Sequence, residues 1–277
     1  MSYIADHVRR DDHDRYLCAL FASSAVREDL FALYAFNAEV AKVRESVSEQ
    51  LIGRMKLQWW RDLIATIYEG RDVPKGNPVV QSLAGIIQHH GLAREDFETL
   101  LDTRERDVGD ENFADVADLE SYADGTSARL TSLALQILGA NDEASRAAGR
   151  HVGIAWALTG LMRAVLFQAK ANRVPLPQDL LTDAALTPHD VQERRNAARL
   201  GTVIEQVAQT AHAHLAKART YAVHIDRRAL PALLPATLAD SYLHGLQRRK
   251  YDVFDPRHAL QRPAVGCLIW NGLRGRF

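Results

Sequence analysis

Cysteine is nearly absent from this chain of 277 residues, which contains only Cys18 and Cys267, far apart in sequence. Two distant cysteines exclude a disulfide framework and a cysteine zinc cluster, and they are typical of a reducing compartment. The chain has no uninterrupted apolar run near the roughly 18 residues of a membrane-spanning helix. Its first residues lack a signal-peptide core. We therefore expect a cytoplasmic protein, with peripheral contact at the inner membrane as the remaining alternative.

An excess of charge of either sign is also lacking. The chain carries 34 Lys and Arg against 35 Asp and Glu, which gives a net charge of -1. A nearly neutral chain has no general attraction to nucleic acid, so we expect no nucleic-acid partner. No repeat or shift in composition marks a boundary, and we expect one domain over residues 1–277.

The alternation of apolar and polar residues that marks a β-strand is almost missing, and helical periodicity dominates. Met55, Trp59, Leu63 and Ile67, for example, recur at four-residue steps and line one face of a predicted helix. The predicted helices span residues 26–45, 51–68, 77–90, 94–107, 119–138, 142–171, 195–224 and 229–249. Segments that contain helix-breaking residues such as Gly, Pro, Asn and Asp separate them at 70–78, 109–118 and 172–179. This pattern predicts an all-α, mainly antiparallel bundle.

Acidic residues are absent from one long stretch. No Asp or Glu occurs between Ser145 and Gln178, where the average of the chain predicts about four. Basic residues remain there, at Arg146, Arg150, Arg163, Lys170 and Arg173. A buried helix explains missing charge in general, but not missing acids beside retained bases. A core helix with basic ends is the alternative interpretation.

Small or neutral residues form a stripe within this stretch. Gly160, Ala164 and Gln168 stand at i, i+4 and i+8 of the predicted helix, with Arg163 close beside them. Such a stripe either lets a neighbouring helix approach closely or leaves room for a ligand. The spacing leaves both possibilities open.

Four segments resemble squalene and phytoene synthases. The segment "ALTGLMRAVLFQAKANRVPLPQD" resembles the second aspartate-rich helix of that family, and "REDLFALYAFNAEVAKVRES" resembles the first. "LQWWRDLIATIYEG" is similar to its tryptophan-containing helix, and "LESYADGTSARLTSLALQILG" to its tyrosine-containing segment. The resemblance implies an all-α isoprenoid synthase fold with a central cavity. It also implies head-to-head joining of two prenyl diphosphates with magnesium held by two acid clusters.

The chain departs from both metal motifs of that family. The first motif has Ala41 and Lys42 where aspartates are usual, and only its last acid remains, as Glu45. The usual acids of the second motif are replaced by Ala164, Phe167 and Gln168. Magnesium requires oxygen ligands, so we expect no metal ligand, no catalytic residue and no cofactor. Mg²⁺ belongs only to the alternative of an active enzyme.

Basic residues are the remaining candidates for holding a diphosphate, because Lys and Arg bind phosphate oxygens directly. Lys42, Arg44 and Arg163 are in place for this. Such contacts support binding of a diphosphate better than its departure as a leaving group, because departure requires stabilisation of the charge that develops on it. The candidate cavity residues that the resemblance implies are Tyr34, Asn37, Ala41, Glu45, Tyr122, Gly160, Arg163, Ala164, Phe167, Gln168 and Arg173.

A closer resemblance is to one branch of the family, the mitochondrial complex I assembly factor of squalene/phytoene-synthase type and its bacterial relatives. "YAFNAEVAKVRESVSEQLIGRMKLQWWRD" and "QRRKYDVFDPRH" carry it. That branch likewise replaces both acid clusters. The resemblance implies a non-catalytic protein in assembly of respiratory complex I, with a complex I subunit or assembly intermediate as partner and a prenyl lipid or diphosphate as ligand. The alternatives are an active head-to-head prenyltransferase and a lipid-binding protein unrelated to respiration.

Three further features have simpler interpretations. In "RRDDHDR", residues 9–15, we expect Asp11 or Asp12 to cap a first helix and the other charges to be solvated. Of the adjacent Trp59 and Trp60, a helix places only one fully inward. Asp107 either faces the cavity or is solvated.

Overall fold

The computed structural model describes residues 2–47, 49–109, 112–171, 173–255, 257 and 261–277. Some residues of the segments 34–62, 109–118, 157–179 and 247–258, which are discussed above, lie outside the described residues. They are residues 48, 110–111, 172, 256 and 258. The described part of the chain contains helices and no strand, which confirms the predicted all-α class. Its principal helices are α1 (Tyr3–Asp11), α2 (His13–Ala19), α3 (Ser24–Ala41), α4 (Gln50–Tyr68), α5 (Pro78–His90), α6 (Arg94–Val108), α7 (Val116–Ala123), α8 (Arg129–Ile137), α9 (Glu143–Ala169), α10 (Gln178–Asp183), α11 (Pro188–Gln192), α12 (Ala197–Thr220), α13 (Leu230–Leu233), α14 (Pro235–Arg248) and α16 (Val265–Arg274).

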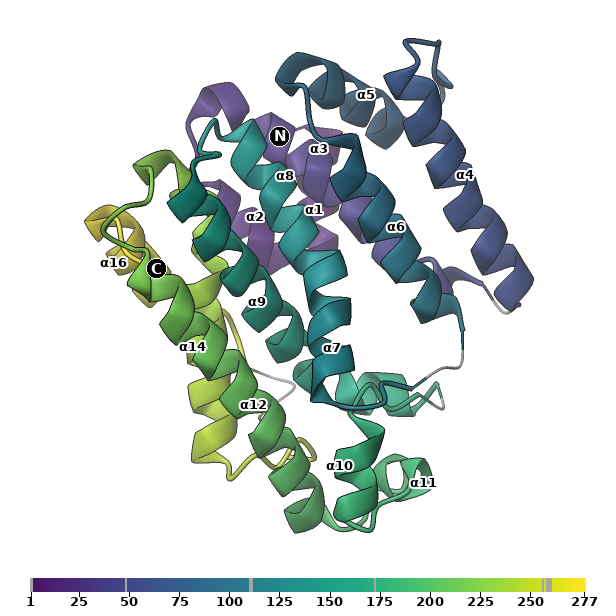
Figure 1. The fold of residues 1–277 in the computed structure, drawn as a ribbon, viewed down its shortest axis with the longest axis vertical. Coiled ribbons are helices and arrows are strands. Elements are labelled where there is room, and N and C mark those ends of the chain that lie inside the picture. Colours follow the sequence, from purple (N-terminus) through teal and green to yellow (C-terminus); the bar gives the residue numbers. More distant parts are fainter. Residues whose placement is uncertain (1, 48, 110–111, 172, 256, 258–260) are drawn as a thin grey trace.

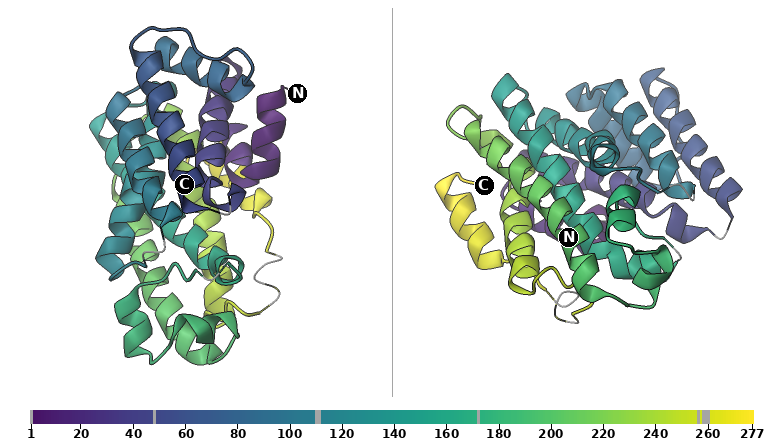
Figure 2. Two further views of the ribbon diagram at one scale, coloured as in Figure 1. Left: turned by 90° about the vertical axis from the view of Figure 1, so that its right-hand side faces the viewer. Right: turned by 60° about the horizontal axis from the view of Figure 1, so that its bottom comes forward.

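Helix α9 is the central element of the bundle (Figure 1). It packs against α12, α8, α14 and α7. Asp142 caps its first turn, because its carboxylate accepts a hydrogen bond of 2.9 Å from the Ser145 amide. Helices α4 and α16 lie at opposite edges of the molecule in Figure 1 and in the right-hand view of Figure 2.

Close helix packing explains Gly153 on α9. A Cβ atom at this position would come 2.5 Å from the Cα atom of Ala128, so only glycine allows the contact. Ala128 ends a π-helical turn, Asp124–Ala128, that joins α7 to α8. This turn interrupts the single helix predicted over residues 119–138.

By length and mean hydropathy, α9 is the one helix among the described residues that is apolar enough to cross a membrane. Half of its apolar window is buried inside the bundle. Its apolar sequence is interrupted by Arg163, so it contains no uninterrupted apolar run of that length. One such helix is weak evidence for a membrane span, since the core helix of a bundle has the same length and composition.

Other helix ends also differ from the prediction. The helix predicted over residues 26–45 ends at Ala41, and a 3₁₀ turn follows at Arg44–Ser46. The helix predicted over 229–249 is broken before Pro235, whose missing N–H cannot continue the ladder. Helices α1, α10, α11 and α16 were not predicted.

The expectation for residues 9–15 is wrong in part. Ser2 caps α1, whereas Asp12 caps the second helix by accepting a bond of 3.2 Å from the Arg15 amide. The side chains of Asp11, Asp14 and Arg15 are only 14, 13 and 11% exposed. The chain turns sharply at Asp12, so these charges pack against the bundle and are not solvated. Trp60 is buried and Trp59 exposed, which confirms that one of the pair points inward.

Candidate ligand cavity

A cavity of about 160 Å³ lies where the end of α3 meets α6, α7 and the end of α9. Three arginines, two carboxylates, a tyrosine and a glutamine supply its polar side chains. The lining consists of Ala41, Arg44, Glu45, Arg104, Asp107, Tyr122, Leu161, Phe167, Gln168, Ala171 and Arg173.

Six of the eleven residues predicted for the cavity line it. They are Ala41, Glu45, Tyr122, Phe167, Gln168 and Arg173. The structure thus brings residues 41–45 together with residues 167–173. The resemblance implied that these two segments, in which the usual acids are replaced, lie at one cavity.

Two of the other predicted residues lie on the same face of α9. Gly160 and Ala164 precede Gln168 by two turns and one turn. Gly160 is exposed, and no atom lies within 4 Å of the position that a Cβ would take. The open stripe therefore leaves space and does not serve close helix packing at Gly160.

The remaining three residues lie elsewhere. Tyr34 and Asn37 are buried within α3, at 2 and 6% exposure. Arg163 stacks on the Tyr242 ring, 3.7 Å from its centroid, and its Nη1 lies 3.3 Å from Asp14 Oδ2. Arg163 is not in the lining of the cavity, because five residues separate it from Gln168 and turn it about 140° around α9. Its side chain lies against α2 and α14 instead.

Asp107 is the centre of a hydrogen-bonded cluster on the α6–α7 side of the cavity. Tyr122 Oη donates to its Oδ1 at 2.7 Å, and Arg104 Nη1 donates to its Oδ2 at 2.9 Å. Arg104 Nη1 also donates to Tyr122 Oη at 2.8 Å. Arg173 Nη1 reaches the Asp107 carbonyl oxygen at 2.8 Å. Both carboxylate oxygens of Asp107 therefore already have protein partners.

Sequence reasoning left Asp107 undecided and missed Arg104. The Arg-x-x-Asp spacing at residues 104–107 is the signal available in the sequence, because positions i and i+3 meet on a helix. The partner Tyr122 lies on another helix, and no local pattern specifies that contact.

The charge of this cluster is fixed by its surroundings. Burial raises the pKa of Tyr122, so its hydroxyl remains a donor at neutral pH. Burial alone would lower the pKa of Arg104, but Tyr122 and Asp107 raise it, so the guanidinium stays charged. The Nε atoms of Arg44 and Arg104 are buried and lack a hydrogen-bond partner among the described residues. Such donors call for an acceptor, for example an anion or an ordered water.

The lining supplies few oxygen ligands for magnesium. Mg²⁺ requires near-octahedral coordination by oxygen, usually from one or two carboxylates together with substrate phosphates and water. Ala41, Phe167 and Gln168 replace the expected acids, and Asp107 is engaged with Arg104 and Tyr122. Within the described part of the chain, no group of three or more His, Cys, Asp or Glu is arranged to hold a metal.

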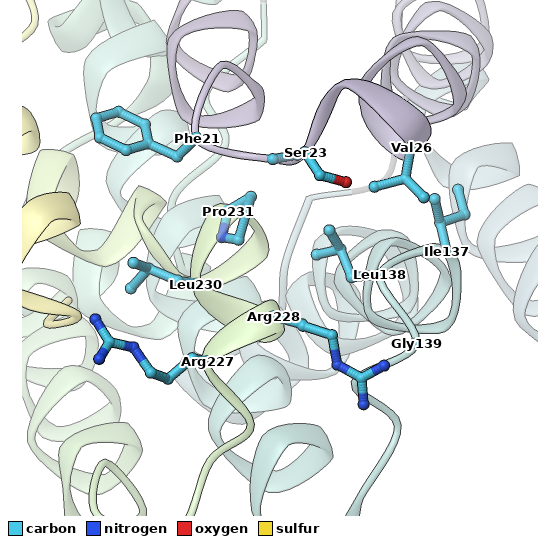
Figure 3. Close-up of a pocket in the computed structure, with 11 residues that line it drawn as sticks. Phe21, Ser23, Val26, Ile137, Leu138, Gly139, Arg227, Arg228, Leu230 and Pro231 are labelled. Carbon is cyan, nitrogen blue, oxygen red and sulfur yellow. The ribbon is translucent and has the colours of Figure 1, made fainter.

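A larger hollow of about 550 Å³ lies elsewhere, between the α2–α3 turn and the start of α13 (Figure 3). Its lining is apolar apart from Ser23, Arg227 and Arg228, and Arg228 is paired with Asp226 at 2.6 Å. None of the predicted cavity residues takes part in it. Size alone therefore does not identify the site that the sequence points to.

The helical bundle and the position of the cavity define a protein of the isoprenoid synthase class. Residues 8–264 match the squalene/phytoene synthase family model, and the chain belongs to this family. The fold agrees: the chain superposes on a dehydrosqualene synthase with a TM-score of 0.84 and 18% identity, covering 98% of this chain and 94% of that one. A squalene synthase from Alicyclobacillus acidocaldarius gives a TM-score of 0.78 at 18% identity, covering 90 and 93%.

Curated relatives include two groups with different names. "NADH dehydrogenase (ubiquinone) complex I, assembly factor 6" from Bos taurus is 33% identical over 94% of this chain and 77% of its own length. The protein of that name from Homo sapiens is 32% identical over 92 and 76%. A presqualene diphosphate synthase from Rhodopseudomonas palustris is 30% identical over 80 and 77%. The expected likeness to complex I assembly factors is confirmed.

Proposed function

We propose that this protein acts in the assembly of respiratory complex I and does not catalyse prenyl transfer. Its likeness to complex I assembly factors extends over more than nine tenths of the chain. The partner on this proposal is a complex I subunit or an assembly intermediate.

The observation that carries the proposal is the state of the carboxylates around the cavity. Prenyl transfer in this family needs magnesium to offset the charge of the leaving diphosphate. Of the two carboxylates on the lining, Asp107 is held by Arg104 and Tyr122, which leaves Glu45. Three arginines against two carboxylates leave the lining with a net positive charge, which favours an anion over a cation.

The proposal includes a ligand held without metal. Arg44, Arg104 and Arg173 face a space of about 160 Å³, which is smaller than the roughly 300 Å³ of a typical small-molecule pocket. The cavity therefore suits an anionic head, such as a diphosphate. A prenyl chain attached to it would extend along the open face of α9 past Ala164 and Gly160.

A second candidate, active prenyl transfer, is favoured by the 30% identity to a presqualene diphosphate synthase. It requires that Glu45 and substrate phosphates alone hold the metal. A third candidate, a lipid carrier unrelated to respiration, shares the anionic ligand with the proposal but predicts no respiratory defect.

A deletion strain separates these functions. The proposal predicts that loss of the protein reduces assembled NADH dehydrogenase on native gels and leaves squalene, phytoene and their diphosphate intermediates unchanged. Restoring the gene should restore the complex. An intact complex with altered isoprenoids would contradict the proposal and favour prenyl transfer.

The ligand is tested separately by native mass spectrometry of the purified protein. We expect a co-purifying prenyl lipid or diphosphate that is lost in Arg173→Gln. Normal respiratory assembly together with a bound lipid would instead support the lipid carrier.

A further inference from the structure

Helix α16 is seated on the bundle by one side only. Leu268 is buried, and Asn271 Nδ2 donates a hydrogen bond of 3.0 Å to Thr237 Oγ1 on α14. Gly272 packs against the Phe21 ring so closely that a side chain there would overlap it. These contacts fix which half of the helix faces outward.

The outward half is apolar. Val265, Ile269, Trp270 and Leu273 are 43, 48, 56 and 76% exposed. At 100° per residue they fall within an arc of about 140°. Gly266 and Cys267 are also exposed, and Arg274 is the first charged residue on that half. A surface helix normally carries polar residues there, so this face lacks its partner.

The charged side chains of the segment that carries this face have one sign. Residues 256–277 contain four arginines and no Asp or Glu. Arg262, Arg274 and Arg276 are exposed, and no carboxylate among the described residues pairs with them. The Arg274 guanidinium lies 3.8 Å from the centroid of the Trp270 ring. The apolar face therefore has cationic groups at both ends.

The basic run next to α14 adds to this charge. Arg248 and Arg249 line a hollow of about 370 Å³ together with Gln261. Gln261 lies three residues before Ala264, the N-cap residue of α16. Gln261 is tied to α14, because its Nε2 donates to the Ser241 carbonyl oxygen at 2.8 Å. The positive region thus extends from α14 to the start of α16.

We propose that α16 is an interfacial helix that binds the protein to an anionic phospholipid surface. Ten residues make a helix of about 15 Å, half the thickness of the hydrocarbon core, so it lies in the interface and does not cross it. Buried apolar side chains and arginines beside anionic headgroups are what hold such helices, and tryptophan favours that depth. An apolar face without acids and with a cationic rim is complementary to anionic lipid.

Helix α4 provides a matched comparison on the other edge of the molecule (Figures 1 and 2). Leu51, Ile52, Met55 and Trp59 are also exposed there, at 66, 41, 63 and 42%. Both signs of charge surround them, since residues 49–62 include Glu49, Arg54, Lys56, Arg61 and Asp62. The inference applies to α16 alone because only its face has the charge that anionic lipid requires. It does not depend on the function proposed above, and α16 follows the last residue matched by the family model.

The test is co-sedimentation of the full chain with vesicles. Binding is expected to vesicles of equal parts phosphatidylglycerol and phosphatidylcholine, and to be weak with phosphatidylcholine alone. Trp270→Ser combined with Leu273→Ser should weaken binding to anionic vesicles at least about tenfold. Arg274→Gln and Arg276→Gln should each weaken it about fivefold at low salt, and less at high salt. The control, Trp59→Ser, should leave binding unchanged.

Three results would overturn the inference. The first is that the wild-type chain fails to bind anionic vesicles. The second is equal loss of binding in Trp59→Ser and in the α16 variants, with all variants keeping the wild-type melting temperature. The third is a dimer in size-exclusion chromatography that the α16 substitutions dissociate without changing vesicle binding, because the face would then serve a second copy of the chain.

Discussion

The two sides of the cavity differ in how their polar groups are used. On the α3–α9 side, Ala41, Phe167 and Gln168 offer no charge to a ligand. On the α6–α7 side, Arg104, Asp107 and Tyr122 form a cluster in which each group bonds to the other two. The difference shows that polar groups persist where they join helices, whereas Glu45 alone remains of the acids expected in the two metal motifs.

The largest expected effect comes from breaking the cluster. Asp107→Ala leaves the Arg104 guanidinium without its carboxylate, although both side chains are less than one fifth exposed. The free energy of unfolding in urea should fall by about 3–5 kcal/mol. Replacing both members, Arg104→Met with Asp107→Leu, should cost less than the single change. A loss below about 1 kcal/mol for Asp107→Ala would mean that the pair is effectively solvated.

The next effect comes from adding acids to the α3–α9 side. Ala41→Asp with Gln168→Asp places two carboxylates near Glu45, a set of oxygen ligands that Mg²⁺ accepts. Mg²⁺ at a hundredfold excess over its dissociation constant should then stabilise this variant by about 2.7 kcal/mol. Thermal unfolding with and without MgCl₂ measures it. The Asn pair at the same positions is the control, and similar stabilisation of the wild-type chain would contradict the assignment.

Binding of diphosphate tests the arginines of the cavity. In calorimetric titrations with EDTA, Arg44→Gln and Arg173→Gln should each weaken inorganic diphosphate binding about tenfold, because a charged hydrogen bond is lost. Arg163→Gln is the matched control, since Arg163 contacts Asp14 and Tyr242 outside the cavity. A larger loss of diphosphate affinity in Arg163→Gln than in Arg173→Gln would mean that the anion binds outside the cavity.

A second, partly buried cluster gives the smallest effect, a dependence of stability on pH. His151 Nδ1 on α9 lies 2.8 Å from His214 Nδ1, and His214 Nε2 lies 2.7 Å from Glu120 Oε1. Burial, and then His214, lower the pKa of His151 from 6.5. His151 therefore binds a proton more readily in the unfolded chain than in the folded one. The free energy of unfolding should be greatest above about pH 6.5 and should decrease as the pH falls below that value.

Melting temperatures between neutral and mildly acidic pH measure this effect, and His151→Gln should flatten the decrease. His212 is exposed on α12, two residues before His214, and supplies the control variant His212→Gln. An unchanged slope in His151→Gln would rule out this titration as the cause.

The central fold elements were predictable because their signals are long. Helix α9 was predicted over residues 142–171 and runs from Glu143 to Ala169, since its capping aspartate and the proline-rich segment after it are both visible in the sequence. Helices α10 and α11 have six and five residues, too few to show a helical period. The π turn at Asp124–Ala128 depends on the contact with Gly153, which no local pattern reveals.

The site was predictable only in part. Ala41 and Gln168 were identified because resemblance places them at fixed positions of two motifs, and the fold then brings these helix ends together. Arg163 was assigned to the cavity because it matches the family, yet its position on the helix turns it toward Asp14. Arg104, one of the three arginines that line the cavity, was missed because its contact is with Tyr122 on another helix. Contacts between helices of this kind cannot be read from the spacing of residues along the sequence.

The most direct test of a cavity that binds anions without metal catalysis is diphosphate release from farnesyl diphosphate by the purified chain in the presence of Mg²⁺. We predict no release above the protein-free blank over a wide range of Mg²⁺ concentration and pH. Release that depends on Mg²⁺, and that is abolished by Glu45→Gln, would contradict the account.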